Sequence, residues 1–265
     1  MEYNEHKISD TRNQIVKSVY WLESESALRP LYFLPDGTPE LMVADVPISV
    51  HTLQKKRIIS GKELLWGQIR FSGIISCPGP YRIFGVKFQP WALRLICEDH
   101  LPVPVDRIIP ARDIIPAAIL EYVNDLLQLE QIGDVWPGVG DDLVADHMNS
   151  VLAKAEITEK LKMAINTLVV DSGIRIASLV PAYNQSLRTL EHHFFTYTGL
   201  RPKAFQKILR LRRVSEGIKR GDTIVQAALE AGFYDQPHFN RAFSRMTLQK
   251  PSEFPWDKNL VLSSL

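Results

Sequence analysis

The last third of the chain contains an internal repeat, and this repeat constrains the fold more than any other feature. Four pairs of residues stand 49 positions apart: Leu190 and Phe239, Phe194 and Phe243, Pro202 and Pro251, and Phe205 and Phe254. A further matching segment precedes each copy, IASLVPAYNQS from Ile176 and IVQAALEAGFYD from Ile224. Each copy has the pattern of a short helix, a tight turn, a second amphipathic helix and a T-x-x-x-P exit. The repeat therefore predicts two helix-turn-helix units.

The second helix of each copy has a predicted cap and an apolar face. Ser186 is the expected N-cap in the first copy and Asp235 in the second, where Pro237 falls in the first turn. The expected apolar anchors are Leu187, Leu190 and Phe194 in the first helix, and Phe239, Ala242, Phe243 and Met246 in the second. A helix held in this way leaves its other face free to enter the major groove of DNA.

The polar faces of these two helices suit the edges of DNA bases. The expected base-reading residues are Arg188, Glu191 and His192 in the first copy, and Gln236, His238, Asn240 and Arg241 in the second. Amide and guanidinium groups bind adenine and guanine, and a carboxylate accepts from cytosine. Each residue taken singly also fits an ordinary solvated helix face. The presence of two copies at one constant spacing favours DNA binding over a solvated helix face.

A helix is expected over residues 203–219, between the two copies. Its length of roughly 25 Å suits two recognition helices placed about one turn of DNA apart. The expected phosphate contacts are Lys203, Lys207, Arg210, Arg213 and Arg245. Residues 173–258 hold 14 Lys and Arg against 7 Asp and Glu, whereas the remainder holds 17 against 23. This asymmetry predicts a local polyanion-binding surface, with a solvated basic helix face as the alternative.

The N-terminal half has a different texture. Short apolar runs separated by turn residues, as in RPLYFLPDGTPELMV, predict strands. From Pro116 the apolar residues follow a helical period, interrupted by a predicted loop over residues 131–142. The predicted fold class is therefore α+β, with a β-rich N-terminal domain followed by helices and an all-α C-terminal domain.

From about Ile157 to Phe254 the sequence resembles the AraC/XylS family of bacterial transcription regulators. The resemblance rests on LRTLEHHFFTYTGLRP, LRLRRVSEGI and IVQAALEAGFYDQPHFNRAFSRMTLQKPSEF. It implies two helix-turn-helix units in successive major grooves, and an N-terminal domain that senses a small molecule, dimerises, or does both. LPDGTPELMV and GQIRFSGIISCPGPYRIFGVKFQPWALRLI resemble, more loosely, a β-rich domain that precedes this module in some members.

The resemblance sets the expected domains and partners. The domains are residues 1–156 for sensing or dimerisation, 157–258 for DNA binding, and a tail over 259–265. The expected partners are double-stranded DNA, a small-molecule effector, a second copy of the chain through the helices of residues 117–156, and RNA polymerase in the case of an activator. The expected location is the bacterial cytoplasm, on the nucleoid when bound.

Several positions depart from the family pattern. His192 stands where arginine is common, which implies a weaker or pH-sensitive contact. Pro181 falls inside the first helix of the first unit and is expected to shorten or kink it. Leu248 replaces the glycine that Gly199 supplies in the first copy. Gly217 stands where leucine is usual, at an expected cost of about 1 kcal/mol relative to alanine.

Other classes of protein find little support in the sequence. The polar N-terminus predicts no signal peptide, no apolar run is long enough to span a membrane, and Cys77 and Cys97 are expected to be reduced core residues. His51, His100 and Asp106 lack the spacing of metal ligands, so we expect neither metal nor cofactor. We expect no catalytic residue and no enzyme activity. The alternative function is an interaction protein that has lost DNA sequence specificity.

The effector site is not predicted. Four residues of the β-rich half suit a ligand pocket, or equally core aromatics and a surface arginine: Trp66, Tyr81, Arg82 and Trp91.

Overall fold

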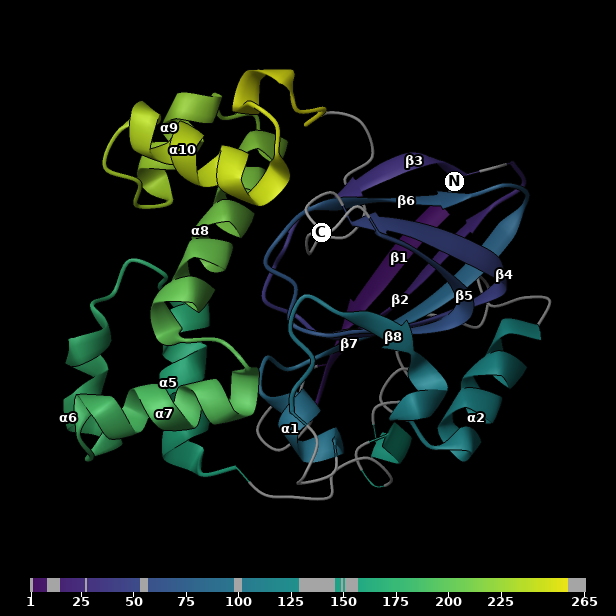
Figure 1. Cartoon of the computed structure of the whole chain (residues 1–265), viewed down its shortest axis with the longest axis horizontal. Helices are drawn as coiled ribbons and strands as arrows, with labels where there is room; N and C mark the ends of the chain where they lie inside the picture. The colour runs from purple at the N-terminus through teal and green to yellow at the C-terminus, as the bar shows by residue number, and fades with distance from the viewer. Residues whose placement is uncertain are drawn as a thin grey trace.

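The computed structural model describes residues 2–8, 15–26, 28–52, 57–97, 102–128, 146–148, 150 and 157–256. A lobe built on a β-sheet lies beside a lobe of helices (Figure 1). The α+β class predicted from the sequence is confirmed. The loop predicted over 131–142 and the tail over 259–265 lie outside the described residues, as does most of the expected dimerisation segment beyond residue 128.

The N-terminal lobe is a single curled sheet of antiparallel strands. Its described strands are β1 (Glu2–Lys7), β2 (Val16–Ser24), β3 (Leu28–Phe33), β4 (Glu40–Thr52), β5 (Arg57–Trp66), β6 (Gly73–Cys77), β7 (Tyr81–Phe88) and β8 (Ile108–Pro110). The order is β1-β2-β7-β4-β5-β8, while β6 pairs with both β3 and β4. The long strand β4 changes neighbour along its length, pairing first with β7 and then with β6 across an irregularity in its register with β5.

Strand β7 is buried on both faces because two cores flank the sheet. Tyr81 and Ile83 pack into the core inside the curl, while Phe84 and Val86 belong to the core shared with the helices. Gly85 lies on the same face as Tyr81 and Ile83 and makes room for the Tyr20 ring, which a β-carbon at this position would meet at 2.0 Å. Both faces of β7 therefore carry apolar side chains, because each face packs into a core.

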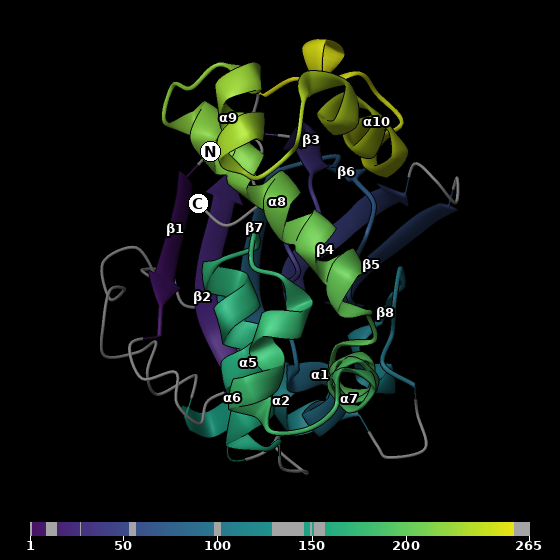
Figure 2. The ribbon, with the colours of Figure 1, turned by 90° about the vertical axis from the view of Figure 1, so that its left-hand side faces the viewer.

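The remaining elements are helices. Ahead of residue 157 these are α1 (Ala92–Ile96), the 3-10 helix η1 (Ala111–Asp113) and α2 (Ala117–Gln128). After it come α5 (Glu159–Val170), η2 (Ile176–Leu179), α6 (Val180–Tyr183), α7 (Leu187–Thr198), α8 (Pro202–Lys219), α9 (Ile224–Glu230), α10 (Gln236–Thr247) and η3 (Pro251–Glu253). The described residues from 157 onward contain no strand, as predicted. Figure 2 shows α8 running from α7 to the α9–α10 pair.

The sequence repeat is a structural repeat. The rings of Phe194 and Phe205 lie 5.4 Å apart in an edge-on pair, and those of Phe243 and Phe254 repeat this pair at 5.2 Å. In both copies a buried threonine closes the helix end. The hydroxyl of Thr198 donates to the carbonyl of Phe194, and the hydroxyl of Thr247 donates to that of Phe243. The constant spacing of 49 residues thus reflects the same side-chain packing in both copies.

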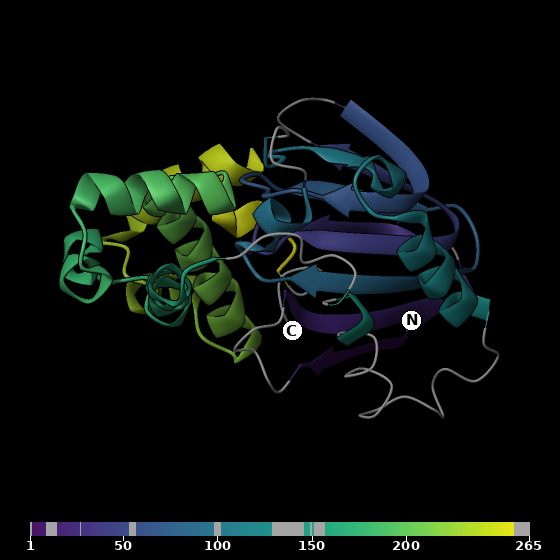
Figure 3. The ribbon, with the colours of Figure 1, turned by 90° about the horizontal axis from the view of Figure 1, so that it is seen from below.

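The two lobes are packed against each other (Figure 3). One hydrophobic core continues from the sheet and α1 into α5, α7 and α8, and Leu34 of the sheet lobe belongs to the core beneath α9 and α10. At Gly37 the chain has a φ of +81° and lies so close to α8 that a β-carbon would meet the Phe205 ring at 2.8 Å. The position of the helix-turn-helix units is therefore tied to that of the sheet.

Candidate nucleic-acid interface

The second helix-turn-helix unit consists of α9 and α10 joined by a turn at Gly232, where φ is +85°. Asp235 caps α10 as predicted, since its carboxylate accepts from the backbone N–H of His238 at 2.6 Å. The rings of Phe239 and Phe243 are fully buried against α9 and η3, and thereby hold the helix by one face. Ala242 and Met246 are half-buried at the edge of that face.

The predicted reading residues of the second unit differ in their exposure and in the contacts they already make. Gln236 and Arg241 are exposed, and Asn240 is half-buried. His238 has a second task, because its Nδ1 accepts from the backbone N–H of Tyr234 at 3.3 Å and its ring packs on Phe233. This bond fixes the tautomer with the proton on Nε2, so the edge left for DNA is a donor.

The first unit is built less regularly. Pro181 falls in the first turn of α6, and the expected helix is divided into the 3-10 turn η2 and a single α-turn. This confirms the predicted shortening, since proline supplies no N–H to a helix. Ser186 caps α7 as predicted, accepting from the N–H of Thr189 at 3.1 Å.

One predicted anchor of the first unit is wrong. Leu190 and Phe194 are fully buried, but the Leu187 side chain is 39% exposed. Leu187 is the first residue of α7, and its exposure shows that the first turn is only partly covered. A contact that the sequence did not indicate braces the unit instead, since the Tyr183 hydroxyl and His193 Nδ1 lie 2.5 Å apart and join α6 to α7.

The predicted reading residues of the first unit lie together. Arg188, Glu191 and His192 line a surface hollow of about 480 Å³, which Phe195 and Arg201 complete. Sequence reasoning missed Arg201, although a basic residue directly ahead of the Pro202 that opens α8 was an available signal. Its exposed side chain adds positive charge beside Glu191.

A groove of about 490 Å³ lies between α10, the start of α8 and the β5–β6 connection. Arg201 lines this groove as well as the first hollow, and thereby links the predicted reading residues of the first unit to His238 and Arg241 of the second. The groove is lined by Arg70, Phe71, Arg201, Lys203, Ala204, Lys207, Ile208, His238, Arg241, Ala242, Arg245 and Met246.

The predicted basic ridge of α8 is divided between two places. Lys203 and Lys207 are exposed in the groove, together with Arg245 of α10. Arg210 instead donates to the carbonyl of Ser172 at 3.3 Å, and Arg213 donates to that of Val170. These two arginines secure the end of α5 and lie apart from the lysines, because they are further along the axis of α8, where the carbonyls at the end of α5 come within reach.

The four residues considered for a ligand pocket are likewise divided. Trp66 and Trp91 are buried in the cores, where Trp66 packs on Phe33 and the Lys162 ammonium lies 5.4 Å from the Trp91 ring centre. Tyr81 and Arg82 instead line a hollow of about 460 Å³ at one end of the sheet. The two tryptophans are therefore core aromatics.

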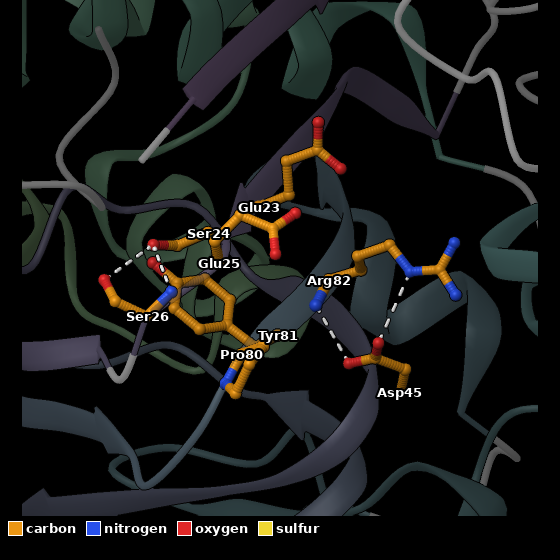
Figure 4. A pocket seen from close by; sticks show the side chains of 8 residues that line it. All are labelled: Glu23, Ser24, Glu25, Ser26, Asp45, Pro80, Tyr81 and Arg82. Carbon is orange, nitrogen blue, oxygen red and sulfur yellow. Dashed lines mark hydrogen bonds and ion pairs between the residues drawn. The ribbon is translucent and has the colours of Figure 1, made fainter.

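Figure 4 shows the hollow at Tyr81, whose lining is Glu23, Ser24, Glu25, Ser26, Asp45, Pro80, Tyr81 and Arg82. Arg82 is paired with Asp45, to which its backbone N–H also donates at 2.8 Å. Tyr81 is buried, which raises its pKa to about 12, with the neighbouring Ser24 hydroxyl opposing that rise. Its own hydroxyl has no hydrogen-bond partner among the described residues.

In the described part of the chain, no three His, Cys, Asp or Glu side chains come together as metal ligands, and His100 lies outside it. Both cysteines are buried and unpaired, as expected. Among the described helices, none has the length and apolar character needed to cross a membrane.

Parts of the chain are similar to known proteins. Residues 179–255 match a family model described as a helix-turn-helix domain. The chain is 32% identical over 80 residues to the HTH-type transcriptional regulator MtrA of Neisseria gonorrhoeae, which covers 30% of this chain and 27% of MtrA. It is 31% identical over 83 residues to the regulatory protein Ada of Salmonella typhimurium, covering 31% of this chain and 24% of Ada. The chain thus matches about a quarter of the length of these relatives.

Among solved structures, ToxT from Vibrio cholerae aligns with 96% of this chain and 97% of its own, at 10% identity and a TM-score of 0.46. ToxT bound to (E)-4-(8-methylnaphthalen-1-yl)but-3-enoic acid aligns with a TM-score of 0.49 at 13% identity, covering 96% of this chain and 98% of that one. The repeated packing and the capped second helices agree with the family match, which identifies residues 179–255 as an AraC-type helix-turn-helix domain.

Proposed function

We propose that this protein is a transcription regulator that binds double-stranded DNA in a sequence-specific way. The observation that carries this proposal is that predicted reading residues of both units line two hollows that share Arg201. Arg188, Glu191 and His192 line one hollow, and His238 and Arg241 line the other. In this proposal residues 157–258 bind DNA, and residues 1–156 sense a ligand or dimerise.

The proposed roles within the DNA-binding region follow from exposure and chemistry. The base-reading residues are Arg188, Glu191, His192, Gln236, His238, Asn240 and Arg241. Lys203, Lys207 and Arg245 are proposed to bind phosphates, because they surround the groove beside α10 with positive charge. Arg210 and Arg213 make bonds to α5 that a phosphate contact has to share or replace.

Control by a small-molecule effector in the N-terminal lobe is the second part of the proposal. The hollow at Tyr81 supports it, because acidic and hydroxyl side chains line it, among them Ser24 and Tyr81, and these groups can bond a polar ligand. The glutamates of this hollow suit a ligand with amine or hydroxyl groups. Binding there shifts DNA affinity only if the ligand has different affinities for two arrangements of the lobes. Dimerisation and contact with RNA polymerase stay predictions.

The deciding experiment is selection of bound sequences from a random duplex library, followed by affinity measurements on the selected duplex. We expect two short sequence blocks about one helical turn apart. Arg241→Ala should then cost about 1–3 kcal/mol of binding free energy and relax preference at one or two base pairs. An unchanged site and affinity would remove Arg241 from the reading set.

The alternative is an interaction protein whose helix-turn-helix pair has lost sequence specificity. The interrupted first helix at Pro181 and the imidazole at His192 favour it for the first unit. That alternative predicts equal affinity and an equal salt dependence on every duplex. A single selected block would instead show that the second unit reads bases and the first only positions the domain.

A further inference from the structure

The β5–β6 connection of the sheet lobe lies on the second recognition helix. The backbone N–H of Ser72 donates to the carbonyl of Met246, near the end of α10, at 2.9 Å. Two residues of the same connection, Arg70 and Phe71, line the groove that also holds His238 and Arg241. A part of the N-terminal lobe therefore borders the proposed DNA-binding face.

The Arg70 side chain is held in one orientation. Its Nε and Nη2 donate to the Asp106 carboxylate at 2.9 Å and 2.5 Å, and the backbone N–H of Arg70 donates to the same group at 2.9 Å. The guanidinium also lies 5.5 Å from the centre of the Phe71 ring. The Asp106 side chain is only 6% exposed, whereas that of Arg70 is 44% exposed. The carboxylate thus lies beneath the guanidinium, and Arg70 Nη1 has no bond to any other described residue.

The surroundings of Arg70 favour an extended anion as the partner. Of the residues lining the groove, Arg201, Lys203, Lys207, Arg241 and Arg245 are basic and His238 is titratable. No acidic side chain is among the described residues that line it. A groove lined by side chains of one sign of charge attracts ions of the opposite sign, which favours a polyanion here.

We propose that Arg70 contacts a DNA phosphate, so that the N-terminal lobe forms part of the DNA interface. This inference rests on the proposed function, because it needs α10 to lie in a major groove. A guanidinium with one carboxylate partner keeps free N–H groups, and its fixed orientation lowers the entropy cost of binding a phosphate oxygen. Phosphate contacts add affinity and fix orientation without reading sequence.

The test compares two exposed arginines of the same lobe, each paired with a carboxylate. Arg70 borders the groove, whereas Arg112 is paired with Glu63 at 2.9 Å and lies outside the groove. Binding of the full chain to a selected duplex and to a scrambled duplex is followed by fluorescence anisotropy at several salt concentrations. Arg70→Ala should weaken binding to both duplexes about 3- to 10-fold and lower the slope of log affinity against log salt by about one. Arg112→Ala should change neither.

A conservative variant separates the charge from the fold. Arg70→Lys keeps a cation and should restore most of the salt slope, whereas a disturbed loop should affect the lysine and alanine variants alike. Arg70→Ala with wild-type affinity and slope would overturn the inference while leaving the proposed function intact. A loss confined to the selected duplex would also overturn it, because it would mean a base contact. Failure of the wild-type chain to bind either duplex at low salt would remove both proposals.

Discussion

A single residue, Leu248, carries strain at the end of the second recognition helix. Its φ of 57° lies in the left-handed region, where the equivalent position of the first copy has Gly199 at 70°. A side chain in this region costs roughly 1–2 kcal/mol, and Leu248 recovers little of that by burial because it is 60% exposed.

We therefore expect Leu248→Gly to raise the free energy of unfolding by about 1 kcal/mol, measured by urea denaturation. Leu248→Ala is the matched control, because it removes the same exposed side chain but keeps the β-carbon. An equal gain from both variants would mean that the exposed apolar surface, not the backbone, is the source of the cost.

The buried carboxyl of Glu40 should make the free energy of unfolding depend on pH. Burial raises its pKa to about 7, while Lys87 and the bond from the Tyr20 hydroxyl oppose that rise, and Asp36 and Glu5 add to it. Between pH 4.5, its ordinary pKa, and about pH 7, the folded chain holds a proton that the unfolded chain has released. The contribution of Glu40 to the free energy of unfolding therefore falls as the pH rises through this window.

Glu40→Gln removes this dependence. We expect it to raise the free energy of unfolding at pH 8 by on the order of 2–3 kcal/mol and to change little at pH 4.5. Urea denaturation at the two pH values measures this, with Glu63→Gln as a control at a carboxylate paired on the surface with Arg112. Equal effects of Glu40→Gln at both pH values would assign the change to packing instead of protonation.

Residue-scale expectations succeeded where the cause is local. The caps at Ser186 and Asp235 could be predicted, because a capping side chain binds a backbone N–H three residues further on. The hydrogen bond of Arg210 could not be predicted, because the carbonyl it binds belongs to Ser172, 38 residues away in the sequence. The periodicity of one helix shows which residues share a face, but not which neighbour that face meets.

At the scale of elements, the contact between α8 and α9 explains a residue that looks unfavourable in the sequence. Gly217 lies within α8, where glycine costs about 1 kcal/mol relative to alanine. In the structure a β-carbon at this position would lie 2.9 Å from the β-carbon of Ala227 in α9 and 2.9 Å from Asp222 Oδ2. Glycine thus permits a close helix approach that the usual leucine would prevent.

Gly217→Ala should lower the free energy of unfolding by about 1–3 kcal/mol in spite of its better helix propensity, because α9 must move. The double variant with Ala227→Gly returns the space and should recover part of the loss. A coupling energy near zero in this double-mutant cycle, measured by urea denaturation, would mean that the loss does not come from contact with Ala227.

At the scale of the whole molecule, the docking of the lobes was not accessible to sequence reasoning. The sheet, the helices and the repeat each follow from patterns within a short window. The approach of Gly37 to Phe205 joins residues 168 positions apart, and no pattern within either segment indicates it. Arg70 was missed for the same reason, since only docking brings it to the groove beside α10.

Gly37 offers a direct test of how firmly the lobes are joined. Alanine there has to adopt a φ of +81° and place a β-carbon 2.8 Å from the Phe205 ring, whereas at Gly221, where φ is +100°, it meets no atom within 4 Å. Gly221→Ala therefore measures backbone strain alone and should lower the free energy of unfolding by about 1 kcal/mol. Gly37→Ala adds the cost of moving the lobes apart and should lower it by about 2–4 kcal/mol in total. Calorimetry should give one unfolding transition for wild type and for Gly221→Ala, because the lobes share a core, and a broadened one for Gly37→Ala. Equal losses and equally sharp transitions in the two variants would mean that the lobes already move freely, and α10 would then not be held against the sheet.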